Sequence, residues 1–198
     1  MKKTFIASAI LLGVAASSSA FAGVTETAPD FSYIDVGYTS YDLDDTDVDA
    51  DGITIGGAFE ISESAFINYS YSTVSIDDYD ADMDTYSIGI GARHALTYST
   101  SLFGSVNYIR SDVDAYGYDD SFNGYGVSAG VKSRISSEIE LTGTLSYTNM
   151  DMDGYDDEDD VTGELGARYY FTNDIAIGLT YQYNSDEQAF AVGARYSF

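Results

Sequence analysis

Apolar and polar residues alternate along most of this chain, and the alternation limits what it can fold into. From Phe31 to Phe198, segments of about ten residues carry apolar side chains at every second position, with Gly, Ser, Thr, Asn or a charged residue between them. Successive side chains of a β-strand point to opposite faces. Each segment therefore predicts a strand with one apolar and one polar face. From Phe31 onward, no continuous apolar stretch is long enough for a transmembrane helix.

Very short polar turns and longer acidic loops alternate between these segments. We expect ten strands, near 31–41, 52–61, 65–75, 85–96, 101–111, 123–135, 138–149, 161–171, 175–184 and 188–198. The acidic loops lie near 42–51, 77–84, 112–122, 150–160 and 184–188. Turns at one end and loops at the other indicate an up-and-down antiparallel meander.

The apolar row could be buried in a soluble sandwich or turned outward to lipid. The lipid-facing arrangement is favoured because aromatic residues flank the aliphatic band at both strand ends. Transmembrane strands carry aromatic residues in this way where they cross the two membrane interfaces. In this chain these residues are Tyr38, Tyr71, Tyr86, Tyr108, Tyr125, Tyr147 and Tyr181 at the loop ends and Phe59, Tyr169, Phe171, Tyr196 and Phe198 at the turn ends. An even number of strands also lets an antiparallel sheet close without an edge. We predict an all-β fold, a closed antiparallel up-and-down transmembrane β-barrel of ten strands, with eight strands as the alternative.

Composition excludes several classes of function. The 198 residues include 33 Asp and Glu but only 8 Lys and Arg, and the net charge of -25 argues against nucleic acid as a partner. Without cysteine, the chain has neither a disulfide framework nor a thiolate metal site. An aromatic content of 15% separates it from disordered acidic proteins.

The N terminus has the features of a secretory signal peptide. Lys2 and Lys3 precede an apolar run, and Ala20-Phe21-Ala22 places small residues where a signal peptidase cleaves. We expect residues 1–22 to be the signal peptide, residues 23–30 to be a short periplasmic tail, and residues 31–198 to form the barrel domain.

The polar row carries charges of both signs, most of them toward the turn ends of the strands. They are Asp35, Glu60, Arg93, Lys132, Arg134, Glu138, Glu140, Glu164, Arg168 and Arg195. Ions removed from water are costly unless they are paired, so these charges predict a network of ion pairs that plugs the turn-side half of the lumen. The loop-side half should leave room for water because it is lined by small residues: Thr54, Gly56, Ser70, Ser72, Ser87, Gly89, Ser105, Gly126, Ser128 and Thr144.

With its signal peptide, its alternating strands and the ending Arg195-Tyr196-Ser197-Phe198, the chain resembles the small, porin-like outer-membrane β-barrel proteins of Gram-negative bacteria. The stretches 48–52 and 166–171 are similar to segments of barrels of this size. The resemblance implies a monomer in the bacterial outer membrane, with outer-membrane lipid and lipopolysaccharide as its surroundings. It also implies that Tyr196 and Phe198 form the assembly signal read by the barrel-assembly machinery. The family includes adhesins, enzymes, small channels and structural proteins, so the resemblance does not choose among these functions.

An enzymatic function is disfavoured by the position of the single histidine. The barrel proteases, lipases and deacylases of this family need a histidine near the outer mouth. Here His94 falls in the lipid-facing row at a turn end, away from the acidic loops. We therefore expect no enzyme of these kinds and assign His94 a structural or interfacial role.

No cofactor is expected beyond loosely bound Ca²⁺ or Mg²⁺. Asp47, Asp49 and Asp51 match the opening of a calcium loop, but the twelfth position is Ala58, where that loop needs a bidentate glutamate. These three residues, with Asp151 and Asp153, are candidate ligands for a weakly held cation. The alternative is that the acidic loops simply stay solvated.

Two functions remain open at this point. The first is a non-enzymatic structural or surface-interaction role, with the lumen plugged by ion pairs and acidic loops outside the cell. The second is a narrow porin-like channel that prefers cations. Barrels of about 8 strands are filled by side chains and those of 16–18 enclose a pore, so ten strands favour the first.

Overall fold

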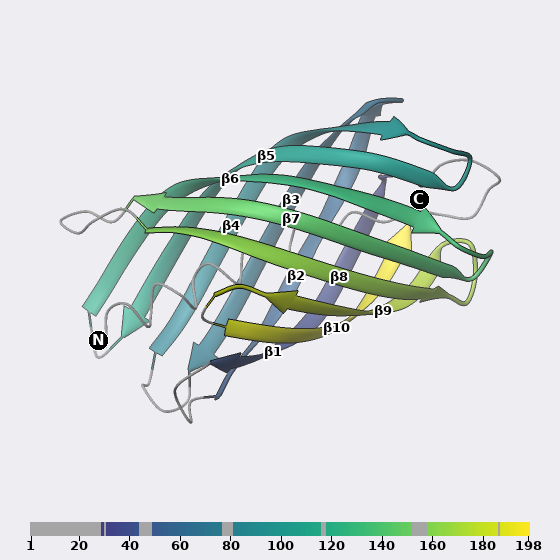
Figure 1. Cartoon of the computed structure of the whole chain (residues 1–198). Helices are drawn as coiled ribbons and strands as arrows, with labels where there is room; N and C mark the ends of the chain where they lie inside the picture. Colours follow the sequence, from purple (N-terminus) through teal and green to yellow (C-terminus); the bar gives the residue numbers. More distant parts are fainter. Residues whose placement is uncertain are drawn as a thin grey trace.

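The chain folds into a closed barrel of ten antiparallel strands (Figure 1). The computed structural model describes residues 29, 31–43, 49–76, 81–115, 118–151, 158–185 and 187–198. The strands are β1 (Tyr33–Leu43), β2 (Asp49–Ser62), β3 (Ala65–Ile76), β4 (Ala81–Ala95), β5 (Thr100–Ala115), β6 (Tyr118–Arg134), β7 (Ile139–Asp151), β8 (Glu158–Tyr170), β9 (Ile175–Tyr183) and β10 (Glu187–Ser197). Among the described residues, no helix is long and apolar enough to cross a membrane. The predicted fold class and the count of ten strands are confirmed, and the alternative of eight is excluded.

Pairing between the first and last strands closes the ring. β1 lies against β2 on one side and against β10 on the other, and the β1–β10 pairing runs from Tyr33 opposite Ser197 to Leu43 opposite Glu187. At its turn end the Phe198 N–H donates to the Ser32 carbonyl at 3.2 Å. Every strand therefore has two neighbours, which is how a sheet satisfies its backbone hydrogen bonds in lipid.

The apolar row faces outward. Ile88, Leu145 and Leu179 are 58%, 61% and 66% exposed, and similar aliphatic residues are exposed on every strand. So wide an apolar surface is unfavourable in water, so this face meets hydrocarbon and the soluble sandwich is excluded.

Both aromatic belts lie on this outward face. Tyr108 and Tyr125 are exposed near the loop end, and Phe171 and Phe198 are exposed at the turn end. His94 is also exposed at the turn end of β4, where it pairs with Leu102 of β5. The single histidine therefore lies on the lipid-facing row, as predicted.

Several strands extend further toward the loop end than the sequence predicted, and β4, β5 and β6 do so by the most. Asp82 and Asp84 belong to β4, and Asp112 and Asp114 belong to β5, all within paired strands rather than in the predicted loops 77–84 and 112–122. The predicted loop bounds are wrong because inward apolar and outward polar residues continue to alternate here, with aspartates in the outward row. The carboxylates are thus held on a sheet that projects past the tyrosine belt.

Inside the barrel, large side chains lie over glycines of the neighbouring strand. Phe66 of β3 lies opposite Gly91 of β4, and Phe103 of β5 lies opposite Gly130 of β6. A Cβ atom on either glycine would overlap the facing ring, so each ring occupies space that only glycine leaves free. Pairs of this kind fill the lumen without pushing the strands apart.

Candidate functional site

Asp35 and Arg195 form the centre of an ion-pair network at the turn end of the lumen. The β1–β10 register places them directly opposite each other; Arg195 Nε donates to Asp35 Oδ1 at 2.6 Å, and Nη2 contacts Oδ2. Arg168 of β8 reaches the same Oδ1 at 3.5 Å. Because the Arg195 side chain has no exposed surface, this pairing is what offsets the loss of its hydration.

Glu140 extends the network across the neighbouring strands. It is fully buried on β7, opposite Arg134 of β6 and Arg168 of β8. Arg134 Nε lies 3.9 Å from Glu140 Oε2, and its guanidinium lies 3.8 Å from the centroid of the Tyr170 ring. A desolvated cation over an aromatic face is stabilised by the ring's negative charge density, so Tyr170 supports the same cation.

Arg93 and Glu60 pair where the N-terminal segment lies inside the barrel. Arg93 Nη2 is 2.8 Å from Glu60 Oε1. Arg93 Nη1 also donates to the Pro29 carbonyl at 2.7 Å, and the Phe31 N–H donates to Glu60 Oε1 at 3.1 Å. Pro29, which we expected in the periplasmic tail, is buried here. The predicted signal peptide and the rest of that tail lie outside the described residues.

An aromatic cluster inside the lumen surrounds Phe31, and the sequence reasoning missed it. The Phe31 ring stacks on Phe66 with centroids 4.7 Å apart and meets Phe103 edge-on at 5.8 Å. Lys132 Nζ lies 3.7 Å from the Phe31 centroid, and Tyr33 completes the cluster. The signal available in the sequence was the presence of Phe66 and Phe103 in the polar row, where they lie opposite Gly91 and Gly130.

Two residues predicted for the plug lie elsewhere. Glu138 is exposed in the turn before β7, where its carboxylate and backbone N–H both bond to the Ser136 hydroxyl. Its place in the network is a wrong prediction, because β7 begins one residue later. Glu164 is buried nearer the loop end, opposite Thr144, and accepts a bond from Gln182 Nε2 at 3.2 Å.

The middle of the lumen is polar and mostly closed by short hydrogen bonds. Asn68 Nδ2 donates to Asn107 Oδ1 at 2.6 Å, and the Ser105 and Ser128 hydroxyls lie 2.8 Å apart. Ser70, Ser105 and Ser128, which are among the small residues predicted for the loop-side half, are buried.

A small cavity remains at the same level, above the ion pairs. It has a volume of about 60 Å³ and is lined by Asp35, Arg168, Thr39, Thr54 and Thr180, together with glycines of β1, β2, β9 and β10. A water molecule needs roughly 10–15 Å³ by this measure, so the cavity can hold a few waters.

Large apolar side chains lie at the loop-side end of the lumen, beside buried polar residues such as Thr85 and Ser111, where we expected small residues and room for water. A buried cluster there includes Val74, Met83, Ile109, Val113 and Met150, drawn from β3, β4, β5 and β7. Tyr41 of β1 and Ala189 of β10 belong to the same cluster, so it spans the lumen. Apolar residues in the polar row near the loop ends were the sequence signal for this second closure.

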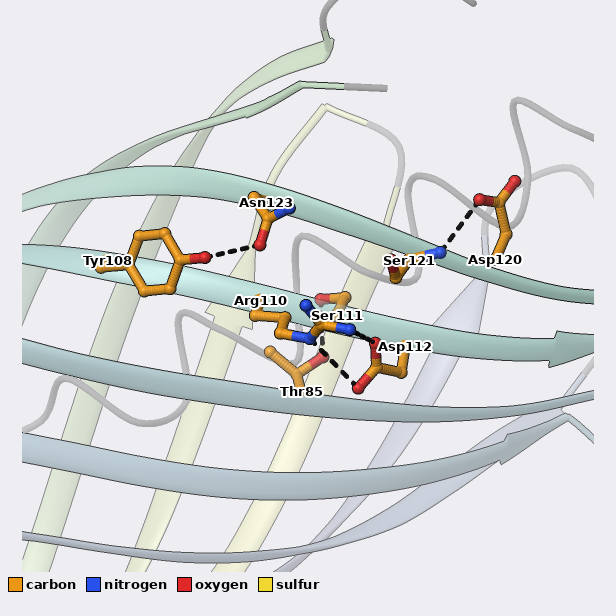
Figure 2. A network of polar contacts seen from close by, with 8 residues as sticks. All are labelled: Thr85, Tyr108, Arg110, Ser111, Asp112, Asp120, Ser121 and Asn123. Atoms are coloured by element: carbon orange, nitrogen blue, oxygen red, sulfur yellow. Dashed lines mark hydrogen bonds and ion pairs between the residues drawn. The ribbon is translucent and has the colours of Figure 1, made fainter. Parts of the chain in front are cut away.

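Outside the barrel, the ends of β4, β5 and β6 carry an acidic surface. Asp82, Asp114 and Asp119 lie directly opposite one another across these three strands. Figure 2 shows the adjoining Arg110, whose Nη2 lies 2.8 Å from Asp112 Oδ1, together with Asp120, which accepts from the Ser121 N–H at 2.9 Å. An open concavity of about 450 Å³ lies over these residues. Like charges facing one another on a sheet repel, so the surface is suited to cations.

Of the predicted calcium ligands, only Asp51 and Asp151 have side chains that the structure describes. Asp47 and Asp153 lie outside the described residues, and the Asp49 side chain is not described. Asp51 and Asp151 are exposed on β2 and β7, strands that are not neighbours. Within the ranges that the structure covers, no group of three or more His, Cys, Asp or Glu residues could hold a metal ion.

A family model described as "Outer membrane protein beta-barrel domain" matches residues 7–163, well over half of the chain. The chain belongs to this outer-membrane β-barrel family. Its place is therefore the bacterial outer membrane, where barrels carry short turns on the periplasmic side and longer loops outside. No curated protein matches the sequence significantly.

Solved structures agree with the family in fold. The translocator domain of the autotransporter NalP from Neisseria meningitidis aligns with a TM-score of 0.50 at 16% identity, over 100% of this chain and 96% of that one. The β domain of the Bordetella autotransporter BrkA gives 0.50 at 12%, over 85% and 99%. A bacterial polysaccharide outer-membrane secretin gives 0.51 at 11%, over 86% and 67%. Identities this low show the fold alone.

The family's assembly signal would lie at the β10 end of the barrel. Tyr196 and Phe198 are both exposed on the outward face, with ring centroids 6.5 Å apart. Phe198 also lies 6.4 Å from the Phe59 ring of β2. Their recognition by the barrel-assembly machinery stays a prediction.

The enclosed Arg195–Asp35 ion pair should contribute far more to the free energy of unfolding of this outer-membrane barrel than the exposed Arg110–Asp112 pair. Arg195→Ala leaves Asp35 with only the longer Arg168 contact, and we expect it to lower the free energy of unfolding by about 3–5 kcal/mol. Arg110→Ala removes an exposed pair and should change it by less than about 1 kcal/mol. Urea unfolding of both variants in lipid vesicles measures the difference, and equal effects would contradict the network.

Proposed function

We propose that this outer-membrane barrel is a non-enzymatic, non-conducting protein that acts through its outer surface. The observation that carries this proposal is the filling of the lumen at both ends. Ion pairs around Asp35 and the aromatic cluster around Phe31 occupy the turn end, and the apolar cluster around Ile109 occupies the loop end. The cavity between them is too small for a solute larger than a few waters.

The acidic end of β4–β6 supports the surface-interaction part of the proposal. Asp82, Asp114 and Asp119 repel one another and project beyond the membrane belt on paired strands. Divalent cations that bridge these carboxylates to lipopolysaccharide phosphates would relieve this repulsion. The surface would in this way attach the barrel to the lipid layer around it.

A narrow cation-preferring channel is the second candidate, and the cavity in the lumen favours it. The residues that line the cavity include Asp35 and three threonines, and the acidic surface outside would concentrate cations. Conduction would require both closures to open.

Planar-bilayer recordings of the refolded protein decide between the two candidates. We expect no discrete current steps at either polarity, because both ends of the lumen are closed. A large-pore porin refolded in the same way serves as the positive control. Reproducible cation-selective steps would contradict the proposal and establish the channel.

Removing one charge from the aspartate row should stabilise the barrel. Asp114→Asn relieves repulsion with Asp82 and Asp119, and we expect it to raise the free energy of unfolding by about 0.2–1 kcal/mol at low salt. It should also reduce the stabilisation that millimolar Ca²⁺ gives. Asp51→Asn is the matched control, since Asp51 lies opposite Ser40 and Ser75. The same response in both variants, or none to Ca²⁺ in the unsubstituted protein, would contradict the cation-bridging surface.

A further inference from the structure

We propose that Pro29 and Phe31 act as a plug carried by the chain itself, and that the cage they occupy is a binding site for a segment with an aromatic side chain. The cage consists of Glu60, Phe66, Arg93, Phe103 and Lys132, from β2 to β6 at the turn end of the lumen. The chain supplies the occupant from the residues that precede β1.

The cage recognises the backbone of the segment through one ion pair. Arg93 donates to the Pro29 carbonyl at 2.7 Å, and Glu60 accepts from the Phe31 N–H at 3.1 Å. Because Arg93 and Glu60 are themselves 2.8 Å apart, each charge is oriented by the other as well as by the segment. A carbonyl and an N–H of the same short stretch are thus both satisfied by side chains.

The cage recognises the aromatic side chain through two rings and two cations. Phe31 has no exposed surface; it stacks on Phe66 at 4.7 Å and meets Phe103 at 5.8 Å. Lys132 Nζ lies 3.7 Å from its centroid and Arg93 Cζ lies 5.4 Å from it. A cation is attracted to the face of an aromatic ring and gains no such attraction from an aliphatic side chain of equal size. This site therefore selects an aromatic residue.

The plug is not part of the barrel wall. The pairing of β1 with β2 and with β10 begins at Tyr33, so Pro29 and Phe31 precede both ladders. A segment held by side chains can leave its site without breaking the hydrogen bonds of the wall, as a local opening. The closing role of the plug rests on the proposed non-conducting function. The plug adds to that function by naming the segment that closes the periplasmic end.

Thiol labelling tests the plug without depending on conductance. The chain has no cysteine, so Ser101→Cys introduces a single thiol. Ser101 is fully buried on β5, opposite Lys132. In the refolded protein we expect a charged methanethiosulfonate reagent to label this thiol slowly. Adding Phe31→Ala should raise the rate at least about tenfold, because the cage is then open to water. Phe31→Tyr keeps the ring and should keep the slow rate.

A second reporter separates loss of the plug from general loosening of the barrel. Ser111→Cys places the thiol on the same strand at the loop end, where Ser111 is equally buried and lies 3.0 Å from the Thr85 hydroxyl. Its labelling rate should not respond to Phe31→Ala. An equal increase at both reporters, or no increase at Ser101→Cys, overturns the proposal.

Folding of each variant is checked by the gel mobility of the unheated barrel. If Phe31→Ala does not fold, Phe31→Leu removes the ring while keeping apolar volume, and the same two comparisons apply to it. Current steps in the unsubstituted barrel would contradict the proposed function, whereas the labelling comparison would still report whether the segment fills the cage. The two proposals can therefore fail separately.

Discussion

Backbone hydrogen bonding in the absence of water is the constraint on which the rest of this structure depends. A sheet in hydrocarbon cannot leave an edge unpaired, so β1 must find β10 and the ring must close. Closure then assigns every side chain to one of two sides. The outward row has to be apolar because it meets lipid, and the inward row can carry charge only if the lumen satisfies it.

The lumen meets that condition in layers. At the periplasmic end, carboxylates such as Asp35 and Glu140 face guanidinium groups, and aromatic rings lie against the cations of Lys132 and Arg134. Hydroxyl and carboxamide groups bond to one another in the middle. At the outer end, aliphatic and methionine side chains meet across the barrel. A ten-stranded ring is narrow enough for such side chains to fill much of it, and the proposed non-conducting function rests on this filling.

Much of this arrangement could be predicted from the sequence, because alternation and turn spacing are local signals. They indicated ten strands, the outward row, the two aromatic belts and the position of His94. The cross-strand partners of the charges could not be read locally, since Asp35 and Arg195 meet only through the register of a ring closed by the two ends of the chain. The cluster around Phe31 was missed for a similar reason: its partners Phe66 and Phe103 lie on strands far from it in the sequence. The strand ends were misjudged where aspartates such as Asp114 continue the alternation beyond the membrane.

The central claim is that apolar side chains face outward into lipid while charged ones are enclosed. The most direct test is to transfer the refolded, monomeric protein from detergent into detergent-free buffer and follow it by light scattering and circular dichroism. The structure predicts that the protein loses its monodisperse state as the aliphatic band is exposed to water. A protein that stayed folded and monomeric in that buffer would show that the apolar face is buried, and would contradict the orientation of every strand described above.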